Sequence, residues 1–256
     1  MSEASIAALS AVGLFIGVLL FLEGGIRLGR AQSRRAGGSL EGGTGVIDTA
    51  VLALLGLLIG FTFNGAYARM ESRRALIARE ANAIGTAYLR LDLLPGEAQK
   101  VLRPLFRQYL EARLRSYEAI MADVPGYRAE LGRLQGEIWT KAEVACRQVP
   151  GPPVTIVVLP AINEMIDITT TREMVAMTRV PGVIITLLFA VSLISALLAG
   201  YAMSTWMRRS WLHMILFAAI IAISIYVILD LENPRIGLIR LDAADVVLQH
   251  LLEKIN

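Results

Sequence analysis

The sequence predicts an all-α membrane protein with four transmembrane helices in two hairpins and a helical-bundle domain inserted between them. Three observations lead to this class. Of the 256 residues, 55% are hydrophobic and only 18% are charged, whereas a soluble globular domain has roughly 25% charged residues. The apolar residues gather in long runs, and the polar stretch between these runs has helical periodicity.

Four runs are long enough to cross a bilayer, which takes roughly 20 mostly apolar residues in a helix. The predicted spans are 5–22, 46–66, 181–203 and 211–229. Four buried helices of a soluble core are the alternative, but each run is too long and too uniformly apolar for that. The first run lacks the basic start and cleavage site of a signal peptide, so we interpret it as a retained span.

We expect four regions along the chain. They are a first transmembrane hairpin (1–66), a soluble helical domain (67–180), a second transmembrane hairpin (181–229) and a tail with a short amphipathic helix (230–256). A glycine-rich connection over 23–45 joins the first hairpin, and the short segment 204–210 joins the second. Trp206 and Trp211 flank that segment, as is typical of aromatic anchors at headgroup depth.

Apolar residues of the soluble domain recur three or four positions apart. This spacing predicts amphipathic helices over 70–91, 102–121, 131–145 and from 154 to about 180, separated by segments rich in proline and glycine. Each helix has one apolar stripe, so the four favour a bundle that covers every stripe. The segment "VTIVVL", 154–159, is compatible with a short extended piece instead.

The second span runs into the first polar helix without a helix breaker. We therefore predict one helix from Val46 to about Leu91, either straight or bent at Asn64-Gly65. At 1.5 Å per residue such a helix is about 70 Å long, roughly twice a bilayer thickness.

The tail is expected to turn at Pro234 and Gly237. Asp242 then resembles the N-cap of an amphipathic helix, whose apolar positions are Val246, Leu248, Leu251 and Leu252. This helix would lie along the membrane surface or pack back onto the bundle.

Residues for catalysis or cofactor binding are scarce, so we predict neither an enzyme nor a cofactor or metal site. His213 and His250 are far apart, and Cys146 is most simply a small buried residue. The sequence holds no phosphate-binding loop and no zinc-protease or hydrolase motif. A net charge of only +3, with both signs mixed along helices, gives no indication of nucleic-acid binding.

Three stretches resemble the bacterial bestrophin-like membrane proteins. They are "REANAIGTAYLRL" at 79–91, "INEMIDITTTRE" at 162–173 and "LDLENPRIGLIRLD" at 229–242. Pro234 and Gly237 fit the family's pattern after the last span, whereas Arg235 replaces its aromatic residue. The resemblance implies an oligomeric channel, for anions in the true bestrophins, whose second span lines a hydrophobic neck.

The leading functional hypothesis is therefore a homo-oligomer in the bacterial inner membrane that forms an ion-conducting path, with anions as the expected ion. If so, the second span is the candidate lining helix, because it joins the soluble domain and holds two polar residues. The candidate pore-lining residues are Leu55, Leu58, Ile59, Thr62, Phe63 and Asn64. The alternative is that these residues pack against other spans.

A non-conducting scaffold or sensor, whose soluble helical domain binds a partner, is the alternative function.

The orientation is also open to two interpretations. The hairpin loops carry the arginines Arg27, Arg30, Arg34, Arg35, Arg208 and Arg209, which favours cytoplasmic loops, with the soluble domain and both termini in the periplasm. Arg69, Arg73 and Arg74 beside the second span, and the family resemblance, favour the opposite.

Overall fold

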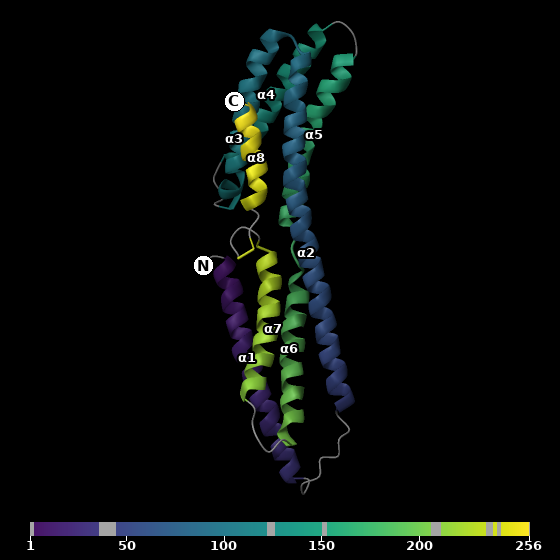
Figure 1. Ribbon diagram of the computed structural model, residues 1–256, viewed down its shortest axis with the longest axis vertical. Coiled ribbons are helices and arrows are strands. Elements are labelled where there is room, and N and C mark those ends of the chain that lie inside the picture. Colours follow the sequence, from purple (N-terminus) through teal and green to yellow (C-terminus); the bar gives the residue numbers. More distant parts are fainter. Residues whose placement is uncertain are drawn as a thin grey trace. The chain divides into compact units, whose positions relative to one another are not determined.

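The computed structural model describes residues 3–35, 45–121, 126–149, 153–205, 211–233, 238–239 and 242–255. All regular elements in these ranges are helices, and four are long and apolar enough to cross a membrane (Figure 1). The predicted all-α class with four spans is confirmed. The chain divides into a membrane unit, Met1–Met70 with Arg179–Arg240, and a helical unit, Glu71–Thr178 with Leu241–Asn256.

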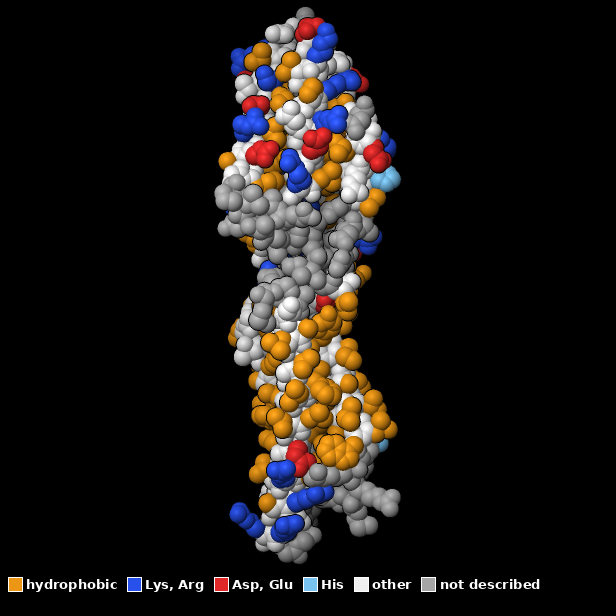
Figure 2. Space-filling view, turned by 90° about the vertical axis from the view of Figure 1, so that its left-hand side faces the viewer, with side chains coloured by type: hydrophobic (Ala, Val, Ile, Leu, Met, Phe, Trp, Pro, Cys, Tyr) orange, Lys and Arg blue, Asp and Glu red, His pale blue; other side chains and the backbone are white. Residues whose placement is uncertain are grey.

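The membrane unit contains α1, α6, α7 and the first half of α2. Helix α1 (Glu3–Arg35) lies along both α6 (Gly182–Ala202) and α7 (Trp211–Leu231). The 3-10 turn Met203–Thr205 follows α6. Apolar side chains from these helices form one core, which includes Leu14, Val18, Leu22, Ile26, Leu188, Ala196, Ala218 and Ile225. Figure 2 shows that apolar side chains also cover the outside of this unit, as a lipid environment requires.

Helix α1 continues to Arg35 and so occupies part of the connection that we expected over 23–45. In this part α1 approaches α6 closely at two glycines, one on each helix. A side-chain carbon at Gly25 would overlap the carbonyl oxygen of Leu197, and one at Gly200 would overlap the carbonyl oxygen of Leu22. Small residues at such positions let helices in lipid pack backbone to backbone. The packing of α1 on α6 thus continues beyond the apolar run of α1.

The helical unit contains the second half of α2 (Gly45–Arg90), the 3-10 turn Leu91–Leu93, α3 (Gly96–Met121), α4 (Tyr127–Gln148), α5 (Pro153–Met177) and α8. The predicted apolar stripe of 131–145 is buried, at Leu131, Leu134, Ile138, Ala142 and Ala145. Mixed basic and acidic side chains cover the outside (Figure 2). The extended alternative for 154–159 is wrong, because this segment belongs to α5.

The second span and the first polar helix form the single helix α2, from Gly45 to Arg90, as predicted. A 3-10 turn follows directly, and Pro95 then separates it from α3. Residues Thr178–Pro181 are not helical, and α6 begins after Pro181. Proline lacks an N–H and restricts the residue before it, so it favours a helix boundary here.

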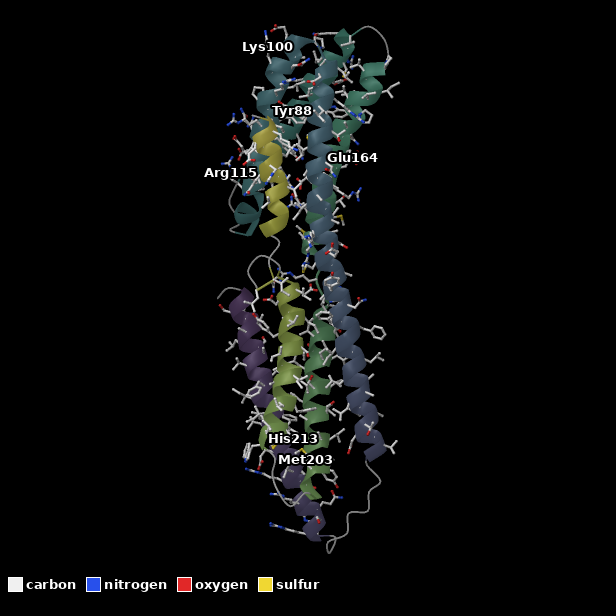
Figure 3. All side chains as sticks on the ribbon, in the orientation of Figure 1. Tyr88, Lys100, Arg115, Glu164, Met203 and His213 are labelled. Atoms are coloured by element: carbon white, nitrogen blue, oxygen red, sulfur yellow. The ribbon has the colours of Figure 1, made fainter. Side chains whose placement is uncertain are left out.

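The predicted tail helix is present as α8 (Asp242–Ile255), and it packs within the helical unit. Leu248 is buried, and the hydroxyl of Tyr88 on α2 donates to the carbonyl oxygen of Ile255 at 3.4 Å (Figure 3). Of the two expected positions for this helix, packing on the bundle is therefore the observed one. Helix α8 begins at Asp242, but the side chain that would form the predicted cap, and the turn at Pro234 and Gly237, lie outside what the structure describes.

Candidate functional site

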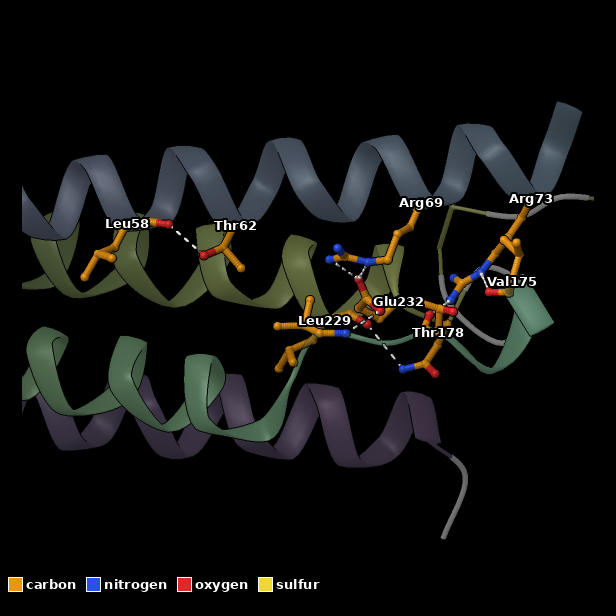
Figure 4. Close-up of polar contacts among 10 residues, drawn as sticks. Leu58, Thr62, Arg69, Arg73, Val175, Thr178, Leu229 and Glu232 are labelled. Carbon is orange, nitrogen blue, oxygen red and sulfur yellow. Dashed lines mark hydrogen bonds and ion pairs between the residues drawn. The ribbon is translucent and has the colours of Figure 1, made fainter.

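Four of the expected pore residues lie on the face of α2 that packs inside the membrane unit. Leu55 is 3% exposed and belongs to the core formed with α1, α6 and α7. Leu58 and Ile59 are half-buried and pack against that core. Thr62 donates its hydroxyl to the carbonyl oxygen of Leu58 at 2.7 Å (Figure 4). Contacts within one chain therefore already cover this face.

The opposite face of α2 is open. Leu57, Phe61 and Asn64 recur three or four positions apart and share that face; Leu57 is 54% and Phe61 68% exposed. Phe63 is 43% exposed and lies to one side of it. Within the described part of the chain, the Asn64 side chain forms no hydrogen bond. A second subunit, lipid or water must therefore cover this face.

Helix α2 is also the least buried of the four spans. Only 11% of its most apolar window is buried within the chain, compared with 33% for α7. Gly56 and Gly60, which form a small-residue pair on α2, have no atom near the position of an added side-chain carbon. Most of the surface of the membrane-spanning part of α2 is thus available for contacts that the single chain does not provide.

An ion pair ties α2 to the end of α7 in the membrane unit. Arg69 lies 2.8 Å from Glu232, whose other carboxylate oxygen accepts the backbone N–H of Val180 at 3.2 Å (Figure 4). Glu232 is only 8% exposed. The pair therefore holds three segments together at this end of the unit.

Asp230 organises the chain after α7. Its two carboxylate oxygens accept the backbone N–H groups of Leu238 and Ile239, each at 3.0 Å. The carboxylate is 3% exposed, so these bonds replace water as its partners. Asp230 and Glu232 come directly after the apolar run 211–229, and nothing in their spacing predicts these partners.

In the helical unit, Arg73 of α2 binds the end of α5. Its guanidinium donates to the carbonyl oxygens of Thr178 at 2.7 Å and of Val175 at 3.5 Å (Figure 4). The last carbonyl groups of a helix have no partner within the helix, and a cation also suits the negative end of the helix dipole. Arg73 thus fixes the point at which α5 stops.

A buried charge cluster lies inside the helical unit. Glu80 of α2 is fully buried and forms ion pairs with Arg113 of α3 and Arg172 of α5. Burial alone would lower the pKa of Arg113, but the charge of Glu80 and the hydrogen bond to it, together with nearby Tyr109 and Tyr127, raise it. Burial would raise the pKa of Glu80, but the charges of Arg113 and Arg172 and their hydrogen bonds together lower it. The cluster connects three helices.

Comparison with known proteins identifies the chain's relatives. A family model for the bestrophin-like domain matches residues 13–245. The chain belongs to the bestrophin-like family. No curated protein matches the sequence. The three stretches that suggested the resemblance, 79–91, 162–173 and 229–242, all lie within the matched region.

Solved structures share the fold of this bestrophin-like chain. Two crystal structures of a bacterial bestrophin homolog from Klebsiella pneumoniae, one of them a single-residue variant, have TM-scores of 0.70 and 0.68 at 15% and 14% identity. They cover 96% and 95% of this chain and 98% and 97% of their own. The structure of a membrane protein variant covers both chains completely, with a TM-score of 0.63 at 15% identity.

Among the described residues of this bestrophin-like chain, those that could support other chemistry do not cluster. Among the residues that the structure describes, no three His, Cys, Asp or Glu side chains are grouped to bind a metal. His213 is exposed near the start of α7, at the same end of the membrane unit as Met203 (Figure 3). Cys146 is buried in α4, and burial raises the pKa of its thiol.

Proposed function

We propose that this bestrophin-like protein assembles as a homo-oligomer and conducts ions, with anions as the expected ion, along the open face of α2. The observation that carries the proposal is that the chain's own helices leave Leu57, Phe61 and Asn64 uncovered on a membrane-spanning helix. The family and its fold support this function, because bestrophins are ion channels.

The open face has the composition of a hydrophobic constriction. Leu57 and Phe61 are four residues apart and project to the same side, and Asn64 follows about one turn later. Apolar rings of this kind gate ion flow by excluding water from a narrow pore. Of the six residues expected from the sequence, we propose that Phe63 and Asn64 border the path.

For Leu55, Leu58, Ile59 and Thr62 we propose a packing role, which is the alternative that the sequence left open. Their contacts inside the membrane unit support this assignment. A residue that fills the core of a single subunit is not available to a path formed between subunits. Substitutions on the two faces of α2 can therefore be compared directly for their effects on ion flux and stability.

The test is ion flux into liposomes that contain purified protein. We expect Phe61→Ala and Leu57→Ala to raise anion flux without loss of thermal stability, and Phe63→Ala to do so less strongly. Leu55→Ala is the matched control, because it removes a similar volume from the core and should cost about 2–5 kcal/mol of stability without raising flux.

Two results of this flux experiment would contradict the proposal. If wild type and both open-face variants carry no flux of chloride or sodium while they remain folded and oligomeric, the channel hypothesis is wrong. The scaffold or sensor function would then be favoured. If Leu55→Ala rather than Phe61→Ala raised the flux, the path would follow the other face of α2.

We also propose that the protein resides in the bacterial inner membrane with the arginine-rich ends of its hairpins in the cytoplasm. Arginines close to the end of a span resist translocation. Arg27, Arg30, Arg34 and Arg35 all lie at the C-terminal end of α1. Under this orientation the helical unit is periplasmic, in contrast to the arrangement that the family resemblance implies.

A further inference from the structure

The last three turns of α1 carry basic residues on one side. Arg27, Arg30 and Arg34 are separated by three and four positions and therefore share a helix face. Gly25, which contacts α6, and Gly29, which contacts α6 and the 3-10 turn after it, lie on the other side of the helix. The close packing of α1 on α6 thus turns the three arginines, which we name the basic face, away from the membrane unit's core.

Among the residues that the structure describes, acidic side chains neutralise only part of the positive charge of the basic face. Arg27 forms an ion pair with Glu23 at 2.8 Å. Arg30 is half-buried and Arg34 exposed, and neither has an acidic partner in the part of the chain that the structure describes. Arg35, on the next face, is also exposed. The surface therefore attracts a multivalent or surface-bound anion.

The position of the basic face indicates where that anion lies. Leu20, which is 65% exposed, and Leu28, which is 56% exposed, place lipid-facing apolar surface directly beside it. Figure 2 shows basic side chains at the lower end of the apolar surface of the membrane unit. From Arg27 to Arg34 the helix rises about 10 Å, which is enough to span one headgroup layer of about 5–7.5 Å.

We propose that the basic face binds the headgroup of an anionic phospholipid from the adjoining leaflet. The guanidinium groups of Arg30 and Arg34 would donate to the phosphate oxygens, for which the planar arrangement of arginine donors is well suited. The acyl chains would begin near Leu28 and run along Leu20 toward the hydrocarbon core. The lipid would thereby supply the anionic partner that the described protein residues do not.

Native mass spectrometry of the delipidated protein tests this proposal. The protein is titrated with phosphatidylglycerol and, separately, with phosphatidylcholine of the same acyl chains. Each basic residue near an anionic membrane surface contributes about fivefold in binding. The double variant Arg30→Gln, Arg34→Gln should therefore bind phosphatidylglycerol about 25-fold more weakly, with phosphatidylcholine binding unchanged.

The matched control removes two surface arginines from the helical unit, Arg133→Gln with Arg147→Gln, and should retain wild-type lipid binding. Arg30→Lys with Arg34→Lys should bind more tightly than the glutamine variant but less tightly than wild type, because lysine keeps the charge and loses the planar donors. Equal phosphatidylglycerol binding by wild type and the Arg30, Arg34 variant would overturn the proposal. Displacement of the lipid by inorganic phosphate at equal concentration would also overturn it, since the site would then recognise a free anion.

Discussion

Glu80 and Arg113 form an ion pair in the interior of the helical unit, where their side chains are 0% and 2% exposed. The pair joins α2 to α3, and Arg172 adds a second partner from α5. Charges that are removed from water are tolerated only when they are paired, so each member depends on the others. These charges are paired only when α2, α3 and α5 have all assembled.

Glu80→Gln should destabilise the protein strongly. The substitution leaves Arg113 buried without a counter-charge, which costs about 3–5 kcal/mol in comparable cases. Thermal unfolding followed by circular dichroism measures the effect. Glu111→Gln is the control, because the Arg107–Glu111 pair is largely exposed and contributes less than about 1 kcal/mol.

A double variant tests whether the unpaired charge of Arg113 causes the loss of stability. Glu80→Gln combined with Arg113→Met should recover part of the lost stability, because the uncompensated buried charge is gone. If Glu80→Gln alone melted like wild type, the buried pair would not be present in the folded protein.

Gly25→Ala should weaken the packing of α1 on α6. The added methyl group would overlap the carbonyl oxygen of Leu197 and would lie 2.7 Å from the backbone nitrogen of Tyr201, so the helices must separate. We expect a loss of about 1–3 kcal/mol, as for overpacked cores. The measurement is thermal stability in detergent.

Gly13→Ala in the same helix is the matched control, because nothing lies within 4 Å of the added carbon. Alanine favours helix over glycine by roughly 1 kcal/mol, so this variant should be as stable as wild type or more so. Equal melting temperatures for Gly25→Ala and Gly13→Ala would contradict the close contact between α1 and α6 at Gly25.

Ala75→Pro tests the continuity of α2. Ala75 is exposed, so its side chain contributes no packing, and the effect must come from the backbone. A proline in a helix interior costs about 3 kcal/mol or more, whereas Ala75→Gly should cost only about 1 kcal/mol. A proline variant that assembles and melts like wild type would indicate a break in the helix at this point.

Cysteine labelling decides the orientation. Single cysteines at Ser39 and at Glu130, each in a Cys146→Ser background, are treated with a membrane-impermeant thiol reagent on intact cells. We expect labelling at position 130 and protection at position 39, with both labelled after lysis. Labelling at position 39 alone would reverse the orientation and agree with the arrangement that the family resemblance implies.

The sequence predicted the fold well because the determining signals are local. Long apolar runs specify spans, and the three- to four-residue spacing of Leu131, Leu134 and Ile138 specifies the buried side of α4. The continuity of α2 followed from the absence of a helix breaker in the stretch that includes Ala68 and Ile77. Each of these signals depends on neighbours within a few turns.

The site was less predictable because it depends on partners far along the chain. Every side of the second span is apolar in sequence, so only the fold distinguishes buried Leu55 from exposed Phe61. The buried charge cluster did leave a signal, since Glu80 lies three residues after Ile77 and four before Ile84, on the apolar stripe. A charge in that position predicts a buried partner, although it does not identify Arg113.

The backbone contact between α1 and α6 limits how the membrane unit can change shape. At Gly25 and Gly200 no side chain separates the two helices, so neither can slide or rotate against the other without opening the contact. These helices must therefore move as one rigid body. Helix α2, which has the least buried surface, is the one span whose movement leaves most internal packing intact. Any conformational cycle of the membrane unit should accordingly appear as a displacement of α2 against a fixed α1–α6 pair.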